Sequence, residues 1–221
     1  MSVQLSQNLD NLDAFWSALA HEPQGEFNIH KSWPNKVWNK GFRSETSLFV
    51  ADKVFVTVEE LTAIKHAATQ IEIRNHLIAM SVQLADVEGE NIEQVKMIDS
   101  EWQLEPWAEA CSKAFGYDID VNALFPLLSD DNAKVFAFWV DGNIAGTAIA
   151  YQTNSVMGIH QVGVLPEFQG KGIGKLLMQH MVAHAHDKGC KLMTLQASEA
   201  GLPIYVKMGF KKLGNVYHLG A

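Results

Sequence analysis

The residues best suited to chemistry lie in the segment 169–175, which reads Gln-Gly-Lys-Gly-Ile-Gly-Lys. An apolar run that ends at Pro166 precedes this segment, and a stretch with helical periodicity follows it. Closely spaced glycines between a strand and a helix leave several backbone N–H groups free to point at one anion. The helix N-terminus adds a favourable partial charge. The pattern therefore predicts a pyrophosphate site, and the alternative is a tight turn that binds no ligand.

Two common phosphate-binding loops do not fit the same residues. A P-loop requires Ser or Thr after its Gly-Lys pair, but Leu176 follows Lys175, and position 169 is Gln rather than Gly. A dinucleotide-binding loop requires a third glycine three residues after Gly172, where Lys175 stands. Both alternatives are excluded.

The elements that must position this loop form a regular series after residue 91. Alternating or apolar runs predict strands at 92–98, 134–140, 144–152, 155–165, 191–197 and 210–219. Helical spacing and end signals predict helices at 101–115, 121–128, 172–188 and 202–208. Asp141-Gly142-Asn143 is a strong hairpin turn between two of these strands. A hairpin followed by strand–helix–strand units predicts a mixed sheet with helices on its faces.

The first 90 residues are less regular. We expect a helix at 11–21, a long ordered loop at 22–43, a strand at 47–56, a helix at 57–70 and a strand at 76–84. The polar stretch 86–91 marks the predicted boundary between an N-terminal segment, 1–90, and a second domain, 91–221.

Composition limits the partners. Of 221 residues, 48% are hydrophobic, which suffices for a sizeable core. The 17 Lys and Arg against 25 Asp and Glu give a net charge of -8, which argues against nucleic acid binding. No basic, apolar leader and no long apolar run is present, so we expect a cytoplasmic protein that does not bind a membrane. Cys111 and Cys190 lack metal-binding spacing, and we expect no metal.

Two motifs together resemble the GNAT (GCN5-related N-acetyltransferase) superfamily. Gln169, Gly172 and Gly174 match its Q/R-x-x-G-x-G/A signature, and the segment 197–210 resembles its Tyr-x-x-x-Gly-Phe region. The resemblance is clear over residues 134–219. It implies an α+β GNAT fold, a mixed and mostly antiparallel sheet flanked by helices, with an extra N-terminal α/β segment. The strand–helix–strand order of that segment is compatible with a degenerate half-copy of the fold.

The resemblance also implies that acetyl-CoA is the co-substrate and names the residues that bind it. Backbone groups of the strand before the loop would hold the pantetheine arm and the acetyl carbonyl, namely Val162, Gly163 and Val164. The loop would hold the pyrophosphate through Gln169, Gly170, Lys171, Gly172, Ile173, Gly174 and Lys175. Ser198 stands where many members have an Asn that contacts the cofactor arm, and it is equally suited to cap a helix.

Three residues are candidates for catalysis, one as the general acid and two as the general base. Tyr205 matches the family tyrosine that protonates the leaving thiolate, and a phenol with a pKa of about 10 holds its proton at neutral pH. Its alternative role is packing the helix against the sheet. His160 is a candidate general base on the strand before the loop, with a satisfied histidine at a sheet edge as the alternative. Glu199 is a second candidate base.

The resemblance implies an acyltransferase that moves an acetyl group directly to a primary amine of a small molecule or peptide. The alternative is a catalytically inactive acyl-CoA-binding sensor or interaction module. His180 and His184 have a spacing compatible with a metal, but no third ligand is near, so a structural pair on the helix flank is favoured. The acceptor amine and the oligomeric state stay open, with a homodimer among the alternatives.

Overall fold

The computed structural model describes residues 2–19, 21–24, 27–39, 42, 54–57 and 72–220. These residues form two compact units, one of Val82–Leu195 and one of Met1–Ser81 together with Gln196–Ala221. The chain passes from one unit to the other within two of its strands, β5 and β10. The domain division expected between residues 90 and 91 stays a prediction, because a compact unit is not by itself a part that folds alone.

The unit Val82–Leu195 carries the glycine-rich loop. Its strands are β6 (Val95–Ile98), β7 (Ala133–Val140), β8 (Asn143–Thr153), β9 (Val156–Val164) and the first part of β10 (Leu192–Ala197). Its helical segments are η2 (Leu84–Asp86), α3 (Glu101–Phe115), η3 (Val121–Ala123), α4 (Phe125–Leu128), η4 (Pro166–Phe168) and α5 (Ile173–Asp187). The strand order is β10-β9-β8-β7-β6, in which only the β9–β10 pair is parallel. The mixed, mostly antiparallel sheet expected from the sequence is confirmed in this unit.

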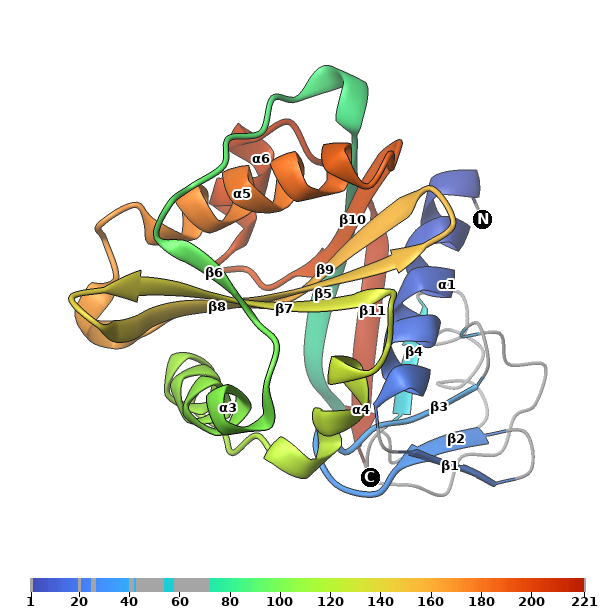
Figure 1. Cartoon of the computed structure of the whole chain (residues 1–221). Helices are drawn as coiled ribbons and strands as arrows, with labels where there is room; N and C mark the ends of the chain where they lie inside the picture. The colour runs from blue at the N-terminus through green and yellow to red at the C-terminus, as the bar shows by residue number, and fades with distance from the viewer. Residues whose placement is uncertain are drawn as a thin grey trace. The chain divides into compact units, whose positions relative to one another are not determined.

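The helices α3 and α5 cover opposite faces of this sheet. Gly163 on β9 is paired with Thr147 on β8, and a Cβ at Gly163 would meet Ala114 of α3. Gly146 precedes Thr147 on β8, and a Cβ at Gly146 would instead meet Leu177 of α5. Adjacent residues of a strand face opposite sides, so the two helices sandwich the strands β8 and β9 (Figure 1).

Local sequence explains where these elements begin and end. The β7–β8 hairpin turns at Asp141 and Gly142 with φ of 48° and 78°, the two positive values that a tight two-residue turn requires. Helix α3 ends at Gly116, whose φ is 74°. At its start, the Gln103 side chain accepts from the Asp99 N–H and from the Ser100 hydroxyl. The pair Ser100 and Gln103 therefore forms only part of a capping box, since the Ser100 side chain makes no cap bond to the helix backbone.

The second unit contains the N-terminal segment and the C-terminal part of the chain. Its helices are α1 (Val3–Ala18) and α6 (Leu202–Lys207). Its strands are β1 (His21–Gln24), β2 (Phe27–His30), β3 (Val37–Asn39), β4 (Val54–Thr57), most of β5 (Glu72–Gln83) and β11 (Lys211–Gly220). The strand order is β1-β2-β3-β4-β11-β5. Its core gathers Trp16, Trp38 and Phe42, whose rings meet edge to face at 5.3 and 5.4 Å from Trp16.

Two expectations for the N-terminal segment were wrong. The helix predicted at 11–21 begins at Val3, because Ser2 caps it by accepting from the Leu5 N–H at 3.2 Å. The stretch 22–43 is not a long loop, since it contains β1, β2 and β3. These strands are only 3 or 4 residues long, too short for an alternating pattern to be visible.

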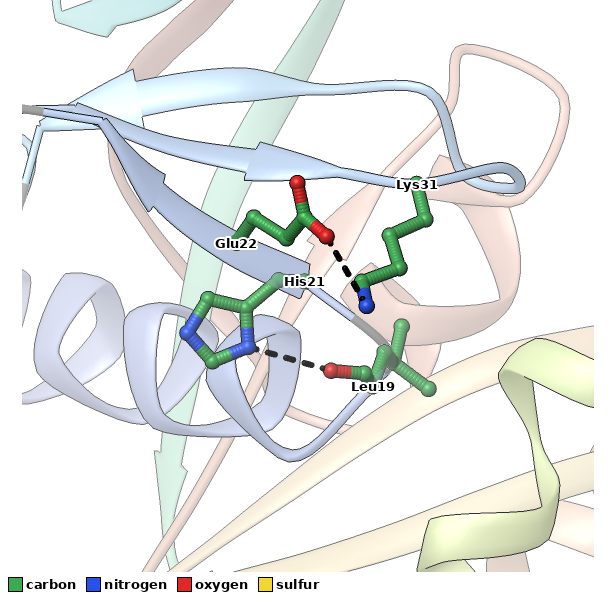
Figure 2. A network of polar contacts seen from close by, with 4 residues as sticks. All are labelled: Leu19, His21, Glu22 and Lys31. Carbon is green, nitrogen blue, oxygen red and sulfur yellow. Dashed lines mark hydrogen bonds and ion pairs between the residues drawn. The ribbon is translucent and has the colours of Figure 1, made fainter.

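A network of polar contacts fastens the β1–β2 hairpin (Figure 2). Glu22 and Lys31 form an ion pair of 2.9 Å, and the His21 Nδ1 lies 3.2 Å from the Leu19 carbonyl oxygen. The hairpin is thus held at the strand end next to α1.

Of the strand predicted at 47–56, residues 54–56 lie in β4, and the remainder lies outside the described residues. The helix predicted at 57–70 also lies outside them, apart from Thr57, which is the last residue of β4. None of the described helices combines the length and the hydropathy needed to cross a bilayer.

Candidate functional site

The glycine-rich segment forms the turn that joins β9 to α5. Gly170 and Gly172 have φ of 75° and 81°, a backbone region that side chains disfavour. A Cβ at either position would meet no atom within 4 Å, so the surface of the loop faces open space. Gly172 is the N-cap of α5 and offers no side chain to cap the helix. The bare turn that the sequence predicts is therefore present.

Backbone N–H groups are exposed along this turn. The N–H groups of Lys175 and Leu176 both donate to the Gly172 carbonyl, at 3.0 and 3.1 Å. The five N–H groups of residues 170–174 donate no hydrogen bond within the part of the chain that the structure describes. They stand at the positive end of a helix of 15 residues. Such a set of donors suits an anion with several oxygens.

The side chains beside the turn are either exposed lysines or groups that contact the protein itself. Gln169 donates from Nε2 to the Val164 carbonyl at 3.2 Å, which fastens the loop to the end of β9. The Lys171 Nζ lies 5.0 Å from the centre of the Phe168 ring, and Lys171 and Lys175 are both exposed. Ile173 is buried under the first turn of α5. Two positive charges thus accompany the free N–H groups.

The strand β9 separates from β10 after the first three of its nine residues. The two strands pair at Val156, Met157 and Gly158, and no register pair beyond Gly158 occurs among the described residues. On its other edge β9 stays paired with β8 as far as Val164. Residues 159–164 therefore have one edge that is not paired with β10 among the described residues.

A bulge interrupts β9 within this open part. Gly163 pairs with Thr147 and His160 pairs with Ile149, so Gln161 and Val162 together stand opposite the single residue between Thr147 and Ile149. Gln161 has a φ of 50°, which is unusual for a residue with a side chain. The Thr147 hydroxyl donates to the Gln161 carbonyl at 3.0 Å. Sequence reasoning missed Gln161 and Thr147, because a bulge at a non-glycine residue has no local signature.

His160 is buried next to this bulge. It is 7% exposed, and its burial lowers its pKa to about 3. At neutral pH the ring is therefore a neutral imidazole. This environment agrees with a histidine whose role is structural. In proton transfer, His160 could act only as a weak base, because its pKa is low.

Tyr205 and Ser198 belong to the other unit. Tyr205 is 9% exposed on α6, its ring centre is 5.8 Å from that of Phe210, and burial raises its pKa to about 12. The Tyr205 hydroxyl donates no hydrogen bond to any described residue. The Ser198 hydroxyl accepts from the Gly201 N–H at 3.2 Å and so caps the turn before α6. Glu199 is exposed, with its carboxylate 3.7 Å from the His76 Nε2.

The remaining titratable candidates have structural surroundings. His180 accepts from the Ile92 N–H at 3.1 Å, and the rings of His180 and His184 lie 5.6 and 5.1 Å from that of Phe136. Both histidines therefore pack against Phe136, and their structural role stays a prediction. Over the described residues, no group of three His, Cys, Asp or Glu side chains could hold a metal ion. Burial raises the pKa of Cys111 to about 12 and also raises that of Cys190.

Comparison with known proteins identifies the family to which the chain belongs. The family model described as the acetyltransferase (GNAT) family matches residues 93–210. The chain is 35% identical over 85 residues to a glucosamine 6-phosphate N-acetyltransferase of Trypanosoma brucei brucei, covering 35% of this chain and 58% of that protein. It is 33% identical over 89 residues to a streptothricin acetyltransferase of Streptomyces lavendulae, covering 38% and 47%. An N-alpha-acetyltransferase RimI of Mycobacterium tuberculosis is 29% identical over 84 residues, covering 34% and 53%. The chain thus spans about half the length of these curated relatives.

Solved structures extend the likeness of fold to the N-terminal segment. A GCN5-related N-acetyltransferase from Kribbella flavida matches with a TM-score of 0.70 at 15% identity, covering 100% of this chain and 96% of that one. A putative GNAT acetyltransferase from Novosphingobium aromaticivorans matches with a TM-score of 0.66 at 13% identity, covering 97% and 98%. At such low identity, this likeness concerns the fold alone.

Proposed function

Since the chain belongs to the GNAT family of acetyltransferases, we propose that it moves an acetyl group from acetyl-CoA directly to a primary amine. The acceptor is the amine of a small molecule or peptide. The observation that carries this proposal is the row of free N–H groups at residues 170–174, at the start of α5.

These N–H groups are the proposed binding site of the CoA pyrophosphate. A diphosphate has several oxygens that can accept at once, and each bond to a charged acceptor is stronger than one between neutral groups. The helix dipole and the exposed Lys171 and Lys175 add positive potential. No side chain fills the turn, because Gly170 and Gly172 leave open space above it.

The open edge of β9 is the proposed binding site of the pantetheine arm. The Leu165 N–H bonds to the Ala145 carbonyl on β8, so the N–H of Val164 points to the opposite, open edge, while the Val164 carbonyl accepts from Gln169. A chain of amides such as pantetheine can add to such an edge as a further strand would. Val162 and Val164 are therefore the proposed backbone contacts, and Gly163 lets α3 approach the strand between them.

Tyr205 is the proposed general acid. As the amine nitrogen bonds to the acetyl carbon, the C–S bond breaks, and the thiolate takes the phenolic proton, which solvent then replaces. A pKa of about 12 keeps this proton on Tyr205 at neutral pH. The missing hydrogen bond partner leaves the hydroxyl available for this contact.

His160 is the proposed acceptor of the amine proton, directly or through water. With a pKa of about 3 it cannot deprotonate a free ammonium with a pKa of about 10. The amine must therefore reach the site in its neutral form, and the proton is released as the new bond forms. A covalent relay through cysteine is disfavoured, because the thiolate is the nucleophile and burial raises the pKa of Cys111 to about 12.

Two measurements test the proposal. Acetyl-CoA at a hundred times its Kd should add about 2.7 kcal/mol to the free energy of unfolding, visible as a rise in Tm. Thiol release should then be followed with glucosamine 6-phosphate, streptothricin and a peptide with a free α-amine, the acceptors that the names of the three relatives suggest. Stabilisation with no thiol release from any amine would favour the inactive binding module. No stabilisation at millimolar acetyl-CoA would overturn the proposal.

A further inference from the structure

The peptide bond between Gln161 and Val162 has a fixed direction. The Gln161 carbonyl oxygen accepts from the Thr147 hydroxyl at 3.0 Å, and that hydroxyl lies on the face of the strands that α3 covers. In a trans peptide the C=O and the following N–H point in opposite directions. The N–H of Val162 therefore points away from the Thr147 hydroxyl, on the stretch of β9 that has no register pair with β10 among the described residues.

The bulge leaves this peptide bond outside the register pairs of β8 and β9. Val162 has no register partner on β8, because the bulge places it and Gln161 opposite one residue. The positive φ of Gln161 is a conformation that residues with side chains leave readily when nothing holds them. The contact that holds the carbonyl comes from the side chain of Thr147, which is completely buried.

A second contact holds the side chain of the same residue. The Cys111 Sγ lies 3.8 Å from the Gln161 Oε1. Gln161 is therefore in contact with α3 through its side chain and with Thr147 of β8 through its carbonyl. A thiol is a weak donor, and the hydroxyl of Thr147 is the stronger of the two. Thr147 is therefore the residue whose loss should free the peptide bond.

We propose that Thr147 is a positioning residue for acyl transfer, because it holds the Gln161 carbonyl so that the Val162 N–H points at the acyl oxygen. This inference rests on the proposed function. As the amine adds to the thioester, negative charge develops on the acyl oxygen, and a donor already aimed at that oxygen stabilises the transition state more than the ground state. Thr147 acts only through the backbone and touches no reacting atom.

The experiment compares Thr147→Val with Thr147→Ser in steady-state thiol release. Removing an oxyanion donor outright costs about 10²–10³ in kcat, so a donor that is kept but no longer held should cost about 10- to 100-fold. The KM for acetyl-CoA should change little, because the free N–H groups at residues 170–174 are untouched. Thr147→Ser keeps the hydroxyl and should restore kcat to within about threefold of wild type.

Thr153→Val is the matched control, the same substitution on the same strand but at the end far from the bulge. It should leave kcat unchanged. A wild-type kcat in Thr147→Val, or a loss confined to KM, would overturn the inference. If Thr147→Val does not fold, Thr147→Cys supplies a weak donor of similar size, and its kcat must lie below wild type and below Thr147→Ser.

Binding separates this inference from the proposed function. Wild type should bind acetyl-CoA more tightly than CoA, and Thr147→Val should lose that preference while it keeps its affinity for CoA. A wild type that binds neither ligand overturns the proposed function and the inference with it. The inference alone is overturned if the wild type binds acetyl-CoA and transfers its acetyl group, while Thr147→Val keeps the wild-type kcat and the same preference for acetyl-CoA over CoA.

Discussion

A methyl group on the α-carbon of Gly163 would lie 2.9 Å from Cε2 of Phe115. The same methyl group would be 2.8 Å from the Ala114 side chain and 3.2 Å from the Thr147 hydroxyl oxygen. The end of α3 therefore rests on the backbone of β9, at the part of the strand that has left β10. Glycine is needed here for close approach and not for an unusual φ, because Gly163 is absent from the residues with positive φ.

We predict that Gly163→Ala destabilises the protein by about 1–3 kcal/mol, as is typical when a methyl group is forced into a packed site. Urea denaturation measures this loss. Gly214→Ala is the control, since its nearest new contact is an ordinary 3.4 Å and its φ is not positive. Equal stability of the two variants would mean that α3 can move away from β9 at no cost. The affinity for acetyl-CoA should also fall in Gly163→Ala, because the edge that α3 supports would shift.

Replacing Tyr205 by Phe separates catalysis from packing. The ring stays against Phe210 at a similar distance, and the lost hydroxyl has no hydrogen bond partner among the described residues. The Tm should therefore change little. Loss of a general acid should lower kcat by about 10²-fold or more, with the Kd for acetyl-CoA unchanged. Thiol release and calorimetric titration measure the two quantities, and a variant with wild-type kcat would leave Tyr205 a packing residue.

Gly172→Asp should abolish acetyl-CoA binding without unfolding α5. A carboxylate at the N-cap would accept from the free N–H groups and would repel a diphosphate. Gly172→Asn is the matched control, because both side chains tolerate a positive φ and can cap a helix, but Asn carries no charge. We expect Asn to weaken binding far less than Asp in a thermal-shift titration. Equal affinity of both variants and wild type would place the diphosphate elsewhere.

The sequence predicted the part of the chain whose signals are local. The Asp-Gly turn fixed the β7–β8 hairpin, and the glycines at 170 and 172 occupy the positive φ that their type suggests. Each of these features depends on the residue itself, so it can be read without a neighbour. The strands and helices expected after residue 91 are present at closely similar bounds, except that the helix expected at 121–128 is the 3-10 turn η3 followed by the short helix α4.

The features that the sequence did not reveal depend on contacts distant along the chain. The bulge at Gln161 is held by Thr147, 14 residues away, and by Cys111, 50 residues away. Likewise, the burial that lowers the pKa of His160 to about 3 is a property of the folded chain and not of the local sequence. The short strands β1 to β3 are set by pairing with one another rather than by their own pattern. Such features require the fold before they can be recognised.

His30 should make the free energy of unfolding depend on pH. Its Nδ1 accepts from the Lys36 N–H at 3.2 Å, so Nε2 carries the proton and donates to the Trp16 carbonyl at 3.1 Å. The bond to Nδ1 requires a neutral ring, because an imidazolium has no acceptor nitrogen. The ring centre lies 4.5 Å from that of Trp38. Burial is the main cause that lowers the pKa of His30 from 6.5 to about 4.

As the pH falls through 6.5, the unfolded chain takes up a proton that the folded chain refuses until about pH 4. The contribution of His30 is therefore complete above pH 6.5 and is lost between pH 6.5 and 4, by at most about 3 kcal/mol. We predict that His30→Gln is less stable than wild type at pH 7 but loses less free energy of unfolding between pH 7 and 4.5. Urea titrations followed by tryptophan fluorescence suit this measurement, because Trp16 and Trp38 adjoin the ring. The exposed His186 provides the control, and His186→Gln should keep the wild-type slope. If His30→Gln also keeps that slope, the ring already carries its proton in the folded state, and the two hydrogen bonds cannot both form as described.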